Sequence, residues 1–573
     1  MKIIKKILSV VLTAAFAASA LLGFSSCARE GGQRVDSTKT QINLRYYAGG
    51  LGTDWIDAAI KAFEEKYANY SFEEGKVGVQ VMKDYVKGAE TPDLVKGSTN
   101  HVYITENVNY YEFVTKDVML DLTDLIKDYA ATGPDSKESG KTIEEKISDS
   151  RKNFYNMGTA SDQKYFALPY YESSVSLIYN VDLFDKKGWY LIDGKSAEGM
   201  TKEQLKDGQT VYSLFLDSDP TATKSAGPDG IKGTSDDGLP ATYADFQALL
   251  TMIEWNGAYS FISNGYTDYF TPCATEIWAT ASGLDEISLS MSFEGKSNTL
   301  LELDANGNVQ YDENGNLKFL PETDIIPSNA YMIHQQKGKL DAIEFVKMMM
   351  NSSYYADSWS PSFSHRMAQK TFINGYENGT VDKEVAMLVD GSWWNCEAKT
   401  DYQSSEERMT KKFATMPIPK PDASQVGENT VRLSERNSMM FINKNTPENA
   451  LPAAKTFVSF LQSDEAMSLF SVYTDALRAM DYKISDENLA KMSYYGRNNY
   501  VTSRAETTDW IDWLPTTTVT KLNASMLDTE SWGFNNGTST SAPFTYYKDN
   551  KNTDPVDYFR QIWKYYKNSW AIK

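Results

Sequence analysis

Histidine, cysteine and positive charge are scarce in this chain. Its 573 residues include three histidines and three cysteines, and 57 lysines and arginines stand against 77 aspartates and glutamates, for a formal net charge of -20. A catalytic triad or zinc site built on histidine is therefore not expected. The acidity also argues against nucleic acid and anionic membrane surfaces as partners, because both need basic patches. A neutral or cationic small molecule is easier to accommodate.

The local motifs of common enzyme classes are also missing. There is no HExxH and no GxSxG, and the Gly-Lys-Ser triplets at 194–196 and 295–297 lack the upstream glycine of a phosphate-binding loop. We therefore expect no enzymatic activity. A secreted glycoside hydrolase stays open as an alternative, because two carboxylates across a groove leave no local signature. A carbohydrate-binding surface adhesin is the other alternative.

Only one long apolar run occurs, and it lies at the start of the chain. Lysines precede an apolar stretch over residues 7–24, and Cys27 follows at the place of a lipobox cysteine. This is typical of a bacterial lipoprotein signal peptide over residues 1–27, with lipid on Cys27; a plain transmembrane anchor is the alternative. Residues 28–40 indicate a flexible tether. We expect the folded part at the cell surface, anchored to the outer face of the cytoplasmic membrane.

The remaining length and cysteine content suit a soluble body of two or three domains. If Cys27 carries lipid, Cys273 and Cys396 remain, either as a disulfide or as two buried thiols. We expect thiols, because a protein of this size needs no covalent staple. Residues 41–47 alternate as a strand does, and a one-face apolar pattern predicts a helix from Thr53. Asn-Gly turns at 306 and 314 predict a surface hairpin over 304–319.

The most informative stretch is EVAMLVDGSWWNCE, residues 384–397. Both alternating registers of its first half are mostly apolar, which predicts a strand covered on both faces. Gly391 permits a sharp turn, and Trp393 and Trp394 follow just beyond the carboxyl end of the strand, where ligands bind in open α/β sheets. Flat rings with polar edges suit the apolar face of a sugar. The alternative is that one tryptophan is core and the other a surface anchor.

Three segments together resemble one known family. Residues 384–397 resemble its Ala-Met, apolar, Gly-x-Trp signature, residues 165–189 its Ala-Leu-Pro loop and Tyr-Asn helix, and residues 437–470 its strand and Ala-Ala-x-x-Phe helix. They occur in the order found in family 1 extracellular solute-binding proteins, the receptors of sugar ABC importers. The resemblance implies an α/β, two-lobed periplasmic-binding-protein-like fold of type II. It further implies a monomeric, lipid-anchored receptor that captures an oligosaccharide and delivers it to the importer's membrane subunits.

The resemblance also implies discontinuous lobes joined by a hinge. We expect an N-terminal lobe from residues 41–170 and 433–480, and a C-terminal lobe from 173–430 and 481–573. Pro169 biases its neighbour toward extended geometry, which places the next three residues on a loop that crosses between the lobes. The predicted ligand-binding residues are Trp393, Trp394, Tyr170, Tyr171, Glu172, Trp278, Asp54, Trp55, Asn100, Trp359 and Asn437. Core packing is the alternative for each aromatic residue among them.

An acidic, glycine-rich insertion spans residues 214–242. Such a density of carboxylates on a flexible loop repels itself unless it is solvated or bound to a hard cation, and Ca²⁺ takes six to eight oxygen ligands. The stretch resembles the GPDGxxGTxDDG calcium loops of other secreted bacterial proteins, although it is no EF-hand. We expect structural Ca²⁺ here, with a solvated acidic loop as the alternative. The predicted ligands are Asp217, Asp219, Asp229, Asp236 and Asp237.

Overall fold

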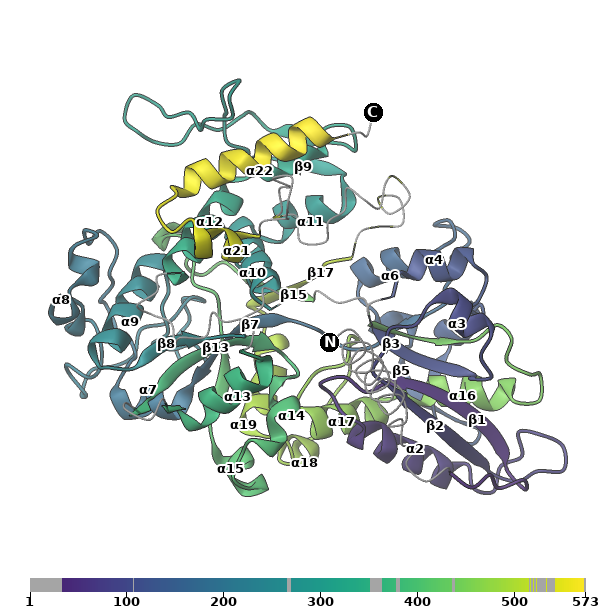
Figure 1. Cartoon of the computed structure of the whole chain (residues 1–573). Coiled ribbons are helices and arrows are strands. Elements are labelled where there is room, and N and C mark those ends of the chain that lie inside the picture. The colour runs from purple at the N-terminus through teal and green to yellow at the C-terminus, as the bar shows by residue number, and fades with distance from the viewer. Residues whose placement is uncertain are drawn as a thin grey trace, which may run out of the picture.

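The chain forms two lobes, each built around its own β-sheet (Figure 1). The computed structural model describes residues 33–106, 108–264, 269–350, 363–377, 382–434, 438–514, 516, 519, 522, 532 and 542–570. The predicted signal peptide, the lipid site at Cys27, and the predicted ligand residues Trp359 and Asn437 lie outside these ranges. Within the ranges described, no helix is both long enough and apolar enough to cross a membrane.

The first lobe contains a five-stranded sheet with the order β2-β1-β3-β16-β6. β1 runs parallel to β2 and β3, and β16 runs antiparallel to both β3 and β6. Segments far apart in the sequence therefore lie side by side, as the purple β1 and the green α16 region show in Figure 1. The strands are β1 (Thr40–Tyr47), β2 (Val79–Val86), β3 (Val102–Glu106), β6 (Leu168–Pro169) and β16 (Ser438–Ile442).

Helix α2 covers one face of this sheet because its apolar side chains repeat on one side. It begins after Thr53 and buries Trp55, Ile56 and Phe63, with the Phe63 ring 5.0 Å from that of Phe457. The predicted first strand and helix are thus confirmed. The helices of this lobe are α2 (Asp54–Lys66), α3 (Pro92–Lys96), α4 (Tyr110–Thr115), α5 (Thr123–Ile126), α6 (Asp149–Tyr155), α16 (Leu451–Phe460) and α17 (Asp464–Thr474), and a hairpin adds β4 (Tyr129–Gly133) and β5 (Ser136–Thr142).

The second lobe contains a four-stranded sheet with the order β14-β7-β13-β8. Every residue of β13 is buried, as its doubly apolar pattern predicts. Met387 and Val389 join the main core, whereas Leu388 packs in a separate cluster around Phe372. The strands are β7 (Val175–Asn180), β8 (Tyr259–Ile262), β13 (Val385–Gly391) and β14 (Phe413–Met416).

Helices surround this second sheet, and short strands extend its periphery. The helices are α7 (Val181–Lys187), α8 (Gly208–Tyr212), α9 (Tyr243–Trp255), α10 (Phe270–Ser282), α11 (Leu284–Ser292), α12 (Lys337–Met349), α13 (His365–Asn374), α14 (Trp394–Glu397), α15 (Ser405–Thr410), α18 (Asp486–Leu489), α19 (Tyr494–Ser503), α21 (Pro543–Asp549) and α22 (Pro555–Ser569). The short strands are β9 (Gly295–Ser297), β10 (Thr323–Ile325), β11 (Tyr376–Glu377) and β12 (Asp382–Lys383). Residues 304–319 form two tight turns joined by isolated bridges instead of one continuous hairpin.

The chain passes between the lobes more than once. It leaves the first sheet at β6 and enters the second at β7, and it returns from β15 (Thr430–Ser434) to β16. β15 pairs in parallel with β17 (Thr508–Asp512) beside these crossings. The predicted fold class, two discontinuous α/β lobes joined by crossing segments, is confirmed. Cys273 and Cys396 are buried free thiols, as expected.

Candidate ligand site between the lobes

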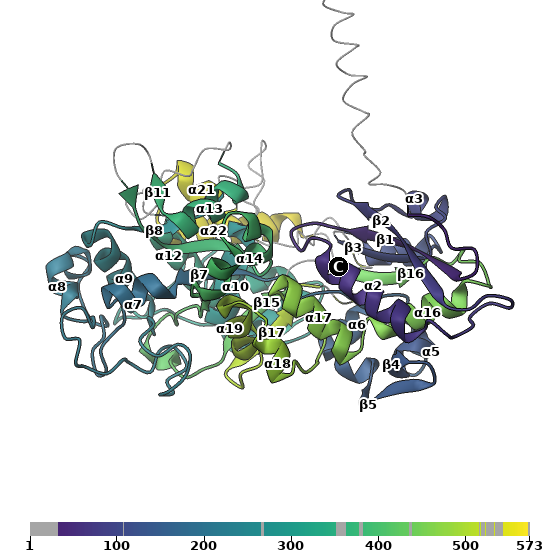
Figure 2. The same ribbon diagram turned by 90° about the horizontal axis from the view of Figure 1, so that it is seen from below.

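The ends of several strands meet where the two lobes face each other. Parallel strands β1 and β3 end at the same edge of the first sheet, and the glycine loop of residues 49–52 follows β1. In the second lobe β13 ends at Gly391 and leads through Trp393 into α14. Figure 2 shows α14 and α17 between the two sheets. The stretch of residues 384–397 therefore reaches the junction between the lobes.

The indole of Trp393 is enclosed by parts of both lobes. A Cβ atom at Gly50 of the first lobe would lie 2.6 Å from Cδ1 of the indole, and a Cβ atom at Gly391 would overlap the other end of the ring. Its edge-to-face neighbours are Tyr171, at 6.5 Å between ring centroids, and Tyr269, at 5.6 Å. Only 4% of Trp393 is exposed. The two glycines thus provide the space that the ring occupies.

Polar contacts between the lobes flank this ring. Lys399 of the second lobe donates to Asp54 of the first at 2.5 Å, and both side chains are about half exposed. The thiol of Cys396 donates to the carbonyl of Leu51 at 3.4 Å. An exposed ion pair contributes only about 0 to 1 kcal/mol, so these contacts orient the lobes without locking them. Asp54, a predicted ligand residue, lies here at the junction.

A buried polar network supports the base of the Trp393 turn. Gln369 donates to Asp390 at 3.1 Å and to Glu397 at 2.8 Å, and His365 lies 3.3 Å from Glu397. The ring of His365 is 6.2 Å from that of Tyr269, so the network reaches the aromatic group at the junction. Carboxylates and an imidazole beside aromatic rings are the groups that hold hydroxyl-rich ligands.

The network shifts the pKa values of its members in different directions. Burial, and then the neighbouring Glu397, raise the pKa of Asp390 to about 8. Burial alone would raise the pKa of Glu397, but hydrogen bonds with His365 and Gln369 outweigh it and lower that pKa. The hydrogen bond with Glu397 raises the pKa of His365. Asp390 is therefore protonated at neutral pH and Glu397 is charged.

Glu172 has a different role from the one predicted. Its carboxylate lies 3.4 Å from Arg504 and 3.8 Å from Arg151, and only 5% of the residue is exposed. Arg151 also pairs with Asp512, which links α6 of the first lobe to β17 of the second. Glu172 thus belongs to a buried ionic network beside the crossings and not to a ligand wall. Its partners are distant in sequence, so no local pattern could identify them.

Several predicted ligand aromatics are core residues. In the first lobe Trp55 donates from Nε1 to Tyr46 at 2.8 Å, and the Tyr46 hydroxyl lies 3.2 Å from that of Tyr170. Burial raises the pKa of Tyr170 well above its usual value. Trp55 and Tyr170 are therefore corrected to core positions. The apolar side of α2 carries Trp55 onto the sheet, and Tyr170 follows directly after the buried strand β6.

Two tryptophans of the second lobe are core residues too. Trp394 is fully buried between Phe372, Phe413 and Tyr495, on a different side of the turn from Trp393, because consecutive helical residues diverge. Trp278 is fully buried on α10, with the ammonium of Lys339 4.0 Å from its ring. The prediction that either tryptophan meets the ligand is therefore wrong.

Asn100 also lies away from the junction. It precedes β3 and is half-buried, and its side-chain amide donates to Asp84 at 3.3 Å. The amino end of β3 is the far end of the strand from the second lobe, so Asn100 is removed from the candidate site. Of the predicted ligand residues described, Trp393, Tyr171 and Asp54 remain at the junction. Gly50, Tyr269 and His365 join them. The sequence features that could have indicated the first two are the glycine-rich stretch of residues 49–52 and the aromatic-rich stretch of residues 259–282.

The five aspartates predicted to bind calcium do not converge on one point. Among the described residues, no group of three or more His, Cys, Asp and Glu side chains is placed to hold a metal ion. Asp217 and Asp219 belong to a separate turn. Asp229 donates from its backbone to Asp236 at 3.1 Å, and Asp237 accepts from a loop amide at 2.8 Å. Calcium binding by this loop stays a prediction.

Comparison with known proteins relates the fold, and not the sequence, to proteins already studied. No family model and no curated protein matches the chain. The raffinose complex of RafE, a protein of Streptococcus pneumoniae, superposes with a TM-score of 0.50 at 14% identity, covering 92% of this chain and 100% of that chain. A chitin oligosaccharide binding protein gives 0.51 at 12% identity over 93% and 99% of the two chains. A probable secreted solute-binding lipoprotein from Streptomyces coelicolor gives 0.51 at 12% over 93% and 100%.

The chain has the two-lobed fold of solute-binding proteins. Within this fold, Trp393 occupies the junction of the lobes, with Gly50 on one side and Tyr171 on the crossing segment. Each matched structure is covered almost completely, so both lobes and the crossings take part in the likeness.

Proposed function

We propose that this protein captures an oligosaccharide between its lobes and delivers it to an ABC importer. The observation that carries the proposal is the enclosure of Trp393 by both lobes together, with Tyr171 and Tyr269 edge-on to it. A ring at such a junction is covered when the lobes are shut and uncovered when they part. It can therefore take part in ligand capture only through lobe motion.

The groups around Trp393 suit a sugar. The indole, Tyr171 and Tyr269 offer apolar faces to the C–H side of a pyranose ring, while His365 and the charged Glu397 offer polar atoms for its hydroxyls. By analogy with stacked bases, each aromatic platform contributes roughly 1 to 3 kcal/mol. The matched structures support this proposal, since one holds raffinose and another is a chitin oligosaccharide binding protein.

We further propose that Cys27 carries a lipid and holds the protein on the outer face of the cytoplasmic membrane. The lipobox-like sequence supports this, and one of the matched structures is described as a probable secreted solute-binding lipoprotein. Mass spectrometry of the mature protein tests it, because a lipidated chain begins at residue 27 with a diacylglyceryl mass on its thiol. An unmodified cysteine would contradict the anchor.

A titration of the lipid-free body, residues 28–573, with a panel of oligosaccharides tests the proposed function. Calorimetry should show one molecule bound per monomer for at least one sugar, and the recovered sugar should be intact. Release of cleaved products from that sugar would favour a glycoside hydrolase instead. Light scattering on the same sample should give the mass of a monomer.

A further inference from the structure

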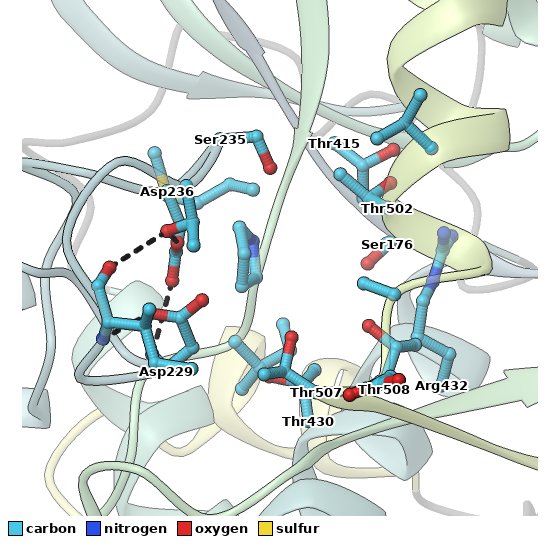
Figure 3. Close-up of a pocket in the computed structure, with 18 of the residues that line it drawn as sticks. Ser176, Asp229, Ser235, Asp236, Thr415, Thr430, Arg432, Thr502, Thr507 and Thr508 are labelled. Atoms are coloured by element: carbon cyan, nitrogen blue, oxygen red, sulfur yellow. Dashed lines mark hydrogen bonds between the residues drawn. The ribbon is translucent and has the colours of Figure 1, made fainter.

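A cavity lies in the second lobe, beside the paired strands β15 and β17 (Figure 3). Its volume is about 460 Å³, and no residue of the first lobe lines it. Its walls come from β7, the acidic loop, α10, the end of β14, and the paired strands β15 and β17. A ligand of about ten heavy atoms fits such a volume, and the cavity is separate from the site that Trp393 marks.

Part of the wall is apolar and part consists of hydroxyl groups. Thr430 and Thr508 are register partners on the parallel strands β15 and β17, and Thr507 lies beside them. Figure 3 shows these three threonines together along one wall, with Ser235 on the loop opposite. Within the described part of the chain, the hydroxyls of these four residues have no hydrogen-bond partner. The apolar lining residues are Ile231, Met416, Pro417, Ile418, Val501 and Ala505.

The charges of the lining are mostly negative. Four carboxylates stand against one guanidinium, and that guanidinium, of Arg432, already donates to Asn499 at 3.1 Å, Ser503 at 3.0 Å and Ser174 at 2.8 Å. The central carbon of the guanidinium lies over the ring of Trp510, 4.8 Å from the ring centroid. Both terminal nitrogens of Arg432 are thus engaged by the protein itself, and its Nε is buried without a partner among the described residues, so the guanidinium presents no accessible donor to an anionic ligand. The four carboxylates belong to Asp229, Asp236, Glu276 and Glu506.

The carboxylates differ in how far they are already engaged. Glu276 is fully buried and accepts from Ser176 and from the backbone of Leu433, and Asp236 accepts hydrogen bonds within its own loop. Glu506, by contrast, is exposed at the rim, and no described residue donates a hydrogen bond to it. The cavity therefore presents free hydroxyl oxygens, one free carboxylate and an apolar wall.

We propose that this cavity binds a small aliphatic primary amine. An ammonium group has three donors and no acceptor, so it matches hydroxyl oxygens and a carboxylate. The alkyl chain lies along the apolar wall, where its methylene groups are removed from water. The ammonium binds Glu506 and the threonine hydroxyls of β15 and β17. This second site is independent of sugar binding at the junction.

Calorimetric titration with hexylamine, 1-hexanol and hexanoate tests the site, because the three probes share a chain and differ in the head group. Hexylamine should bind at least tenfold more tightly than 1-hexanol, and hexanoate should not bind. Equal affinity for 1-hexanol would show a merely apolar cavity and overturn the proposal, as would the absence of hexylamine binding.

Two variants place the binding in this cavity. Glu506→Gln removes the free charge without changing shape and should weaken hexylamine binding about two- to fivefold, whereas Glu313→Gln, on an exposed turn, should leave it unchanged. Ala505→Leu places a larger side chain in the cavity at its apolar wall, and it should abolish hexylamine binding. Hexylamine affinity that is unchanged in both Glu506→Gln and Ala505→Leu would overturn the assignment. Sugar titration of the same variants should match the parent protein, which separates this test from that of the junction.

Discussion

Gly50 and Trp393 fit together across the junction of the lobes: the glycine leaves the space into which the indole projects, and a Cβ atom there would lie 2.6 Å from Cδ1 of the ring. Real Cβ contacts are never that short, so a side chain at residue 50 must displace either the ring or the loop that carries it. The backbone of Gly50 has no positive φ, so an alanine is not strained by its own conformation.

Gly50→Ala should therefore keep the lobes from closing fully. We expect a larger radius of gyration in small-angle X-ray scattering with the sugar bound, and an affinity at least tenfold weaker. Gly88→Ala is the matched control, because nothing lies within 4 Å of a Cβ atom there. Identical scattering and affinity for Gly50→Ala and Gly88→Ala would show that this contact does not control closure.

Arg151 and Asp512 form a buried ion pair between the lobes, with only about 6% and 5% of their side chains exposed. Removing one partner leaves the other charge buried and unpaired, so Arg151→Met should lower the free energy of unfolding by about 3 to 5 kcal/mol. Denaturant unfolding measures this. The exposed pair of Lys141 and Asp481 is the control, and Lys141→Met should cost less than about 1 kcal/mol. Similar losses for both variants would contradict the role of burial.

Asp390 should make stability fall as pH rises. Its folded pKa is raised from 3.8 to about 8, so the unfolded state loses the proton first and the folded state keeps it until about pH 8. The unfolding free energy then decreases between about pH 4 and pH 8, by up to about 1.4 kcal/mol per pH unit from this group. His365, whose pKa is raised in the folded state, also makes stability fall as pH rises. Glu397, whose pKa is lowered in the folded state, has the opposite effect.

Asp390→Asn isolates this contribution, because the amide cannot titrate. The difference in unfolding free energy between variant and parent should shift in favour of the variant as pH rises from 4 to 8. Urea unfolding at several pH values within that window measures the difference. A difference that is constant across the window would show that the folded pKa of Asp390 is not raised.

Calcium binding by the acidic loop predicts a stability that depends on the ion. The melting temperature of the parent protein should fall when a chelator is added and recover with excess Ca²⁺. Asp229→Asn should remove most of that dependence, because Asp229 and Asp236 are the adjacent carboxylates of the loop. A melting temperature that is the same with and without chelator would leave a solvated acidic loop as the explanation.

The sequence predicts those features that local patterns determine. The doubly apolar run of β13, the following Gly391 and the amphipathic side of α2 all form as their residues indicate. The sequence could not predict which of Trp393 and Trp394 lies at the junction of the lobes. The two are adjacent residues of the same type, and only the geometry of the turn sends their side chains in different directions. Glu172 was misassigned because the arginines that engage it come from elements far from it in sequence.

The central claim is that a sugar binds against Trp393 at the junction of the lobes. Calorimetric titration of the oligosaccharide that binds the parent protein, repeated with Trp393→Ala and with Trp255→Ala as a surface control, tests it most directly. We expect Trp393→Ala to weaken binding at least tenfold, or by about 1.4 kcal/mol, and Trp255→Ala to leave it unchanged. Equal affinity in the two folded variants would contradict it.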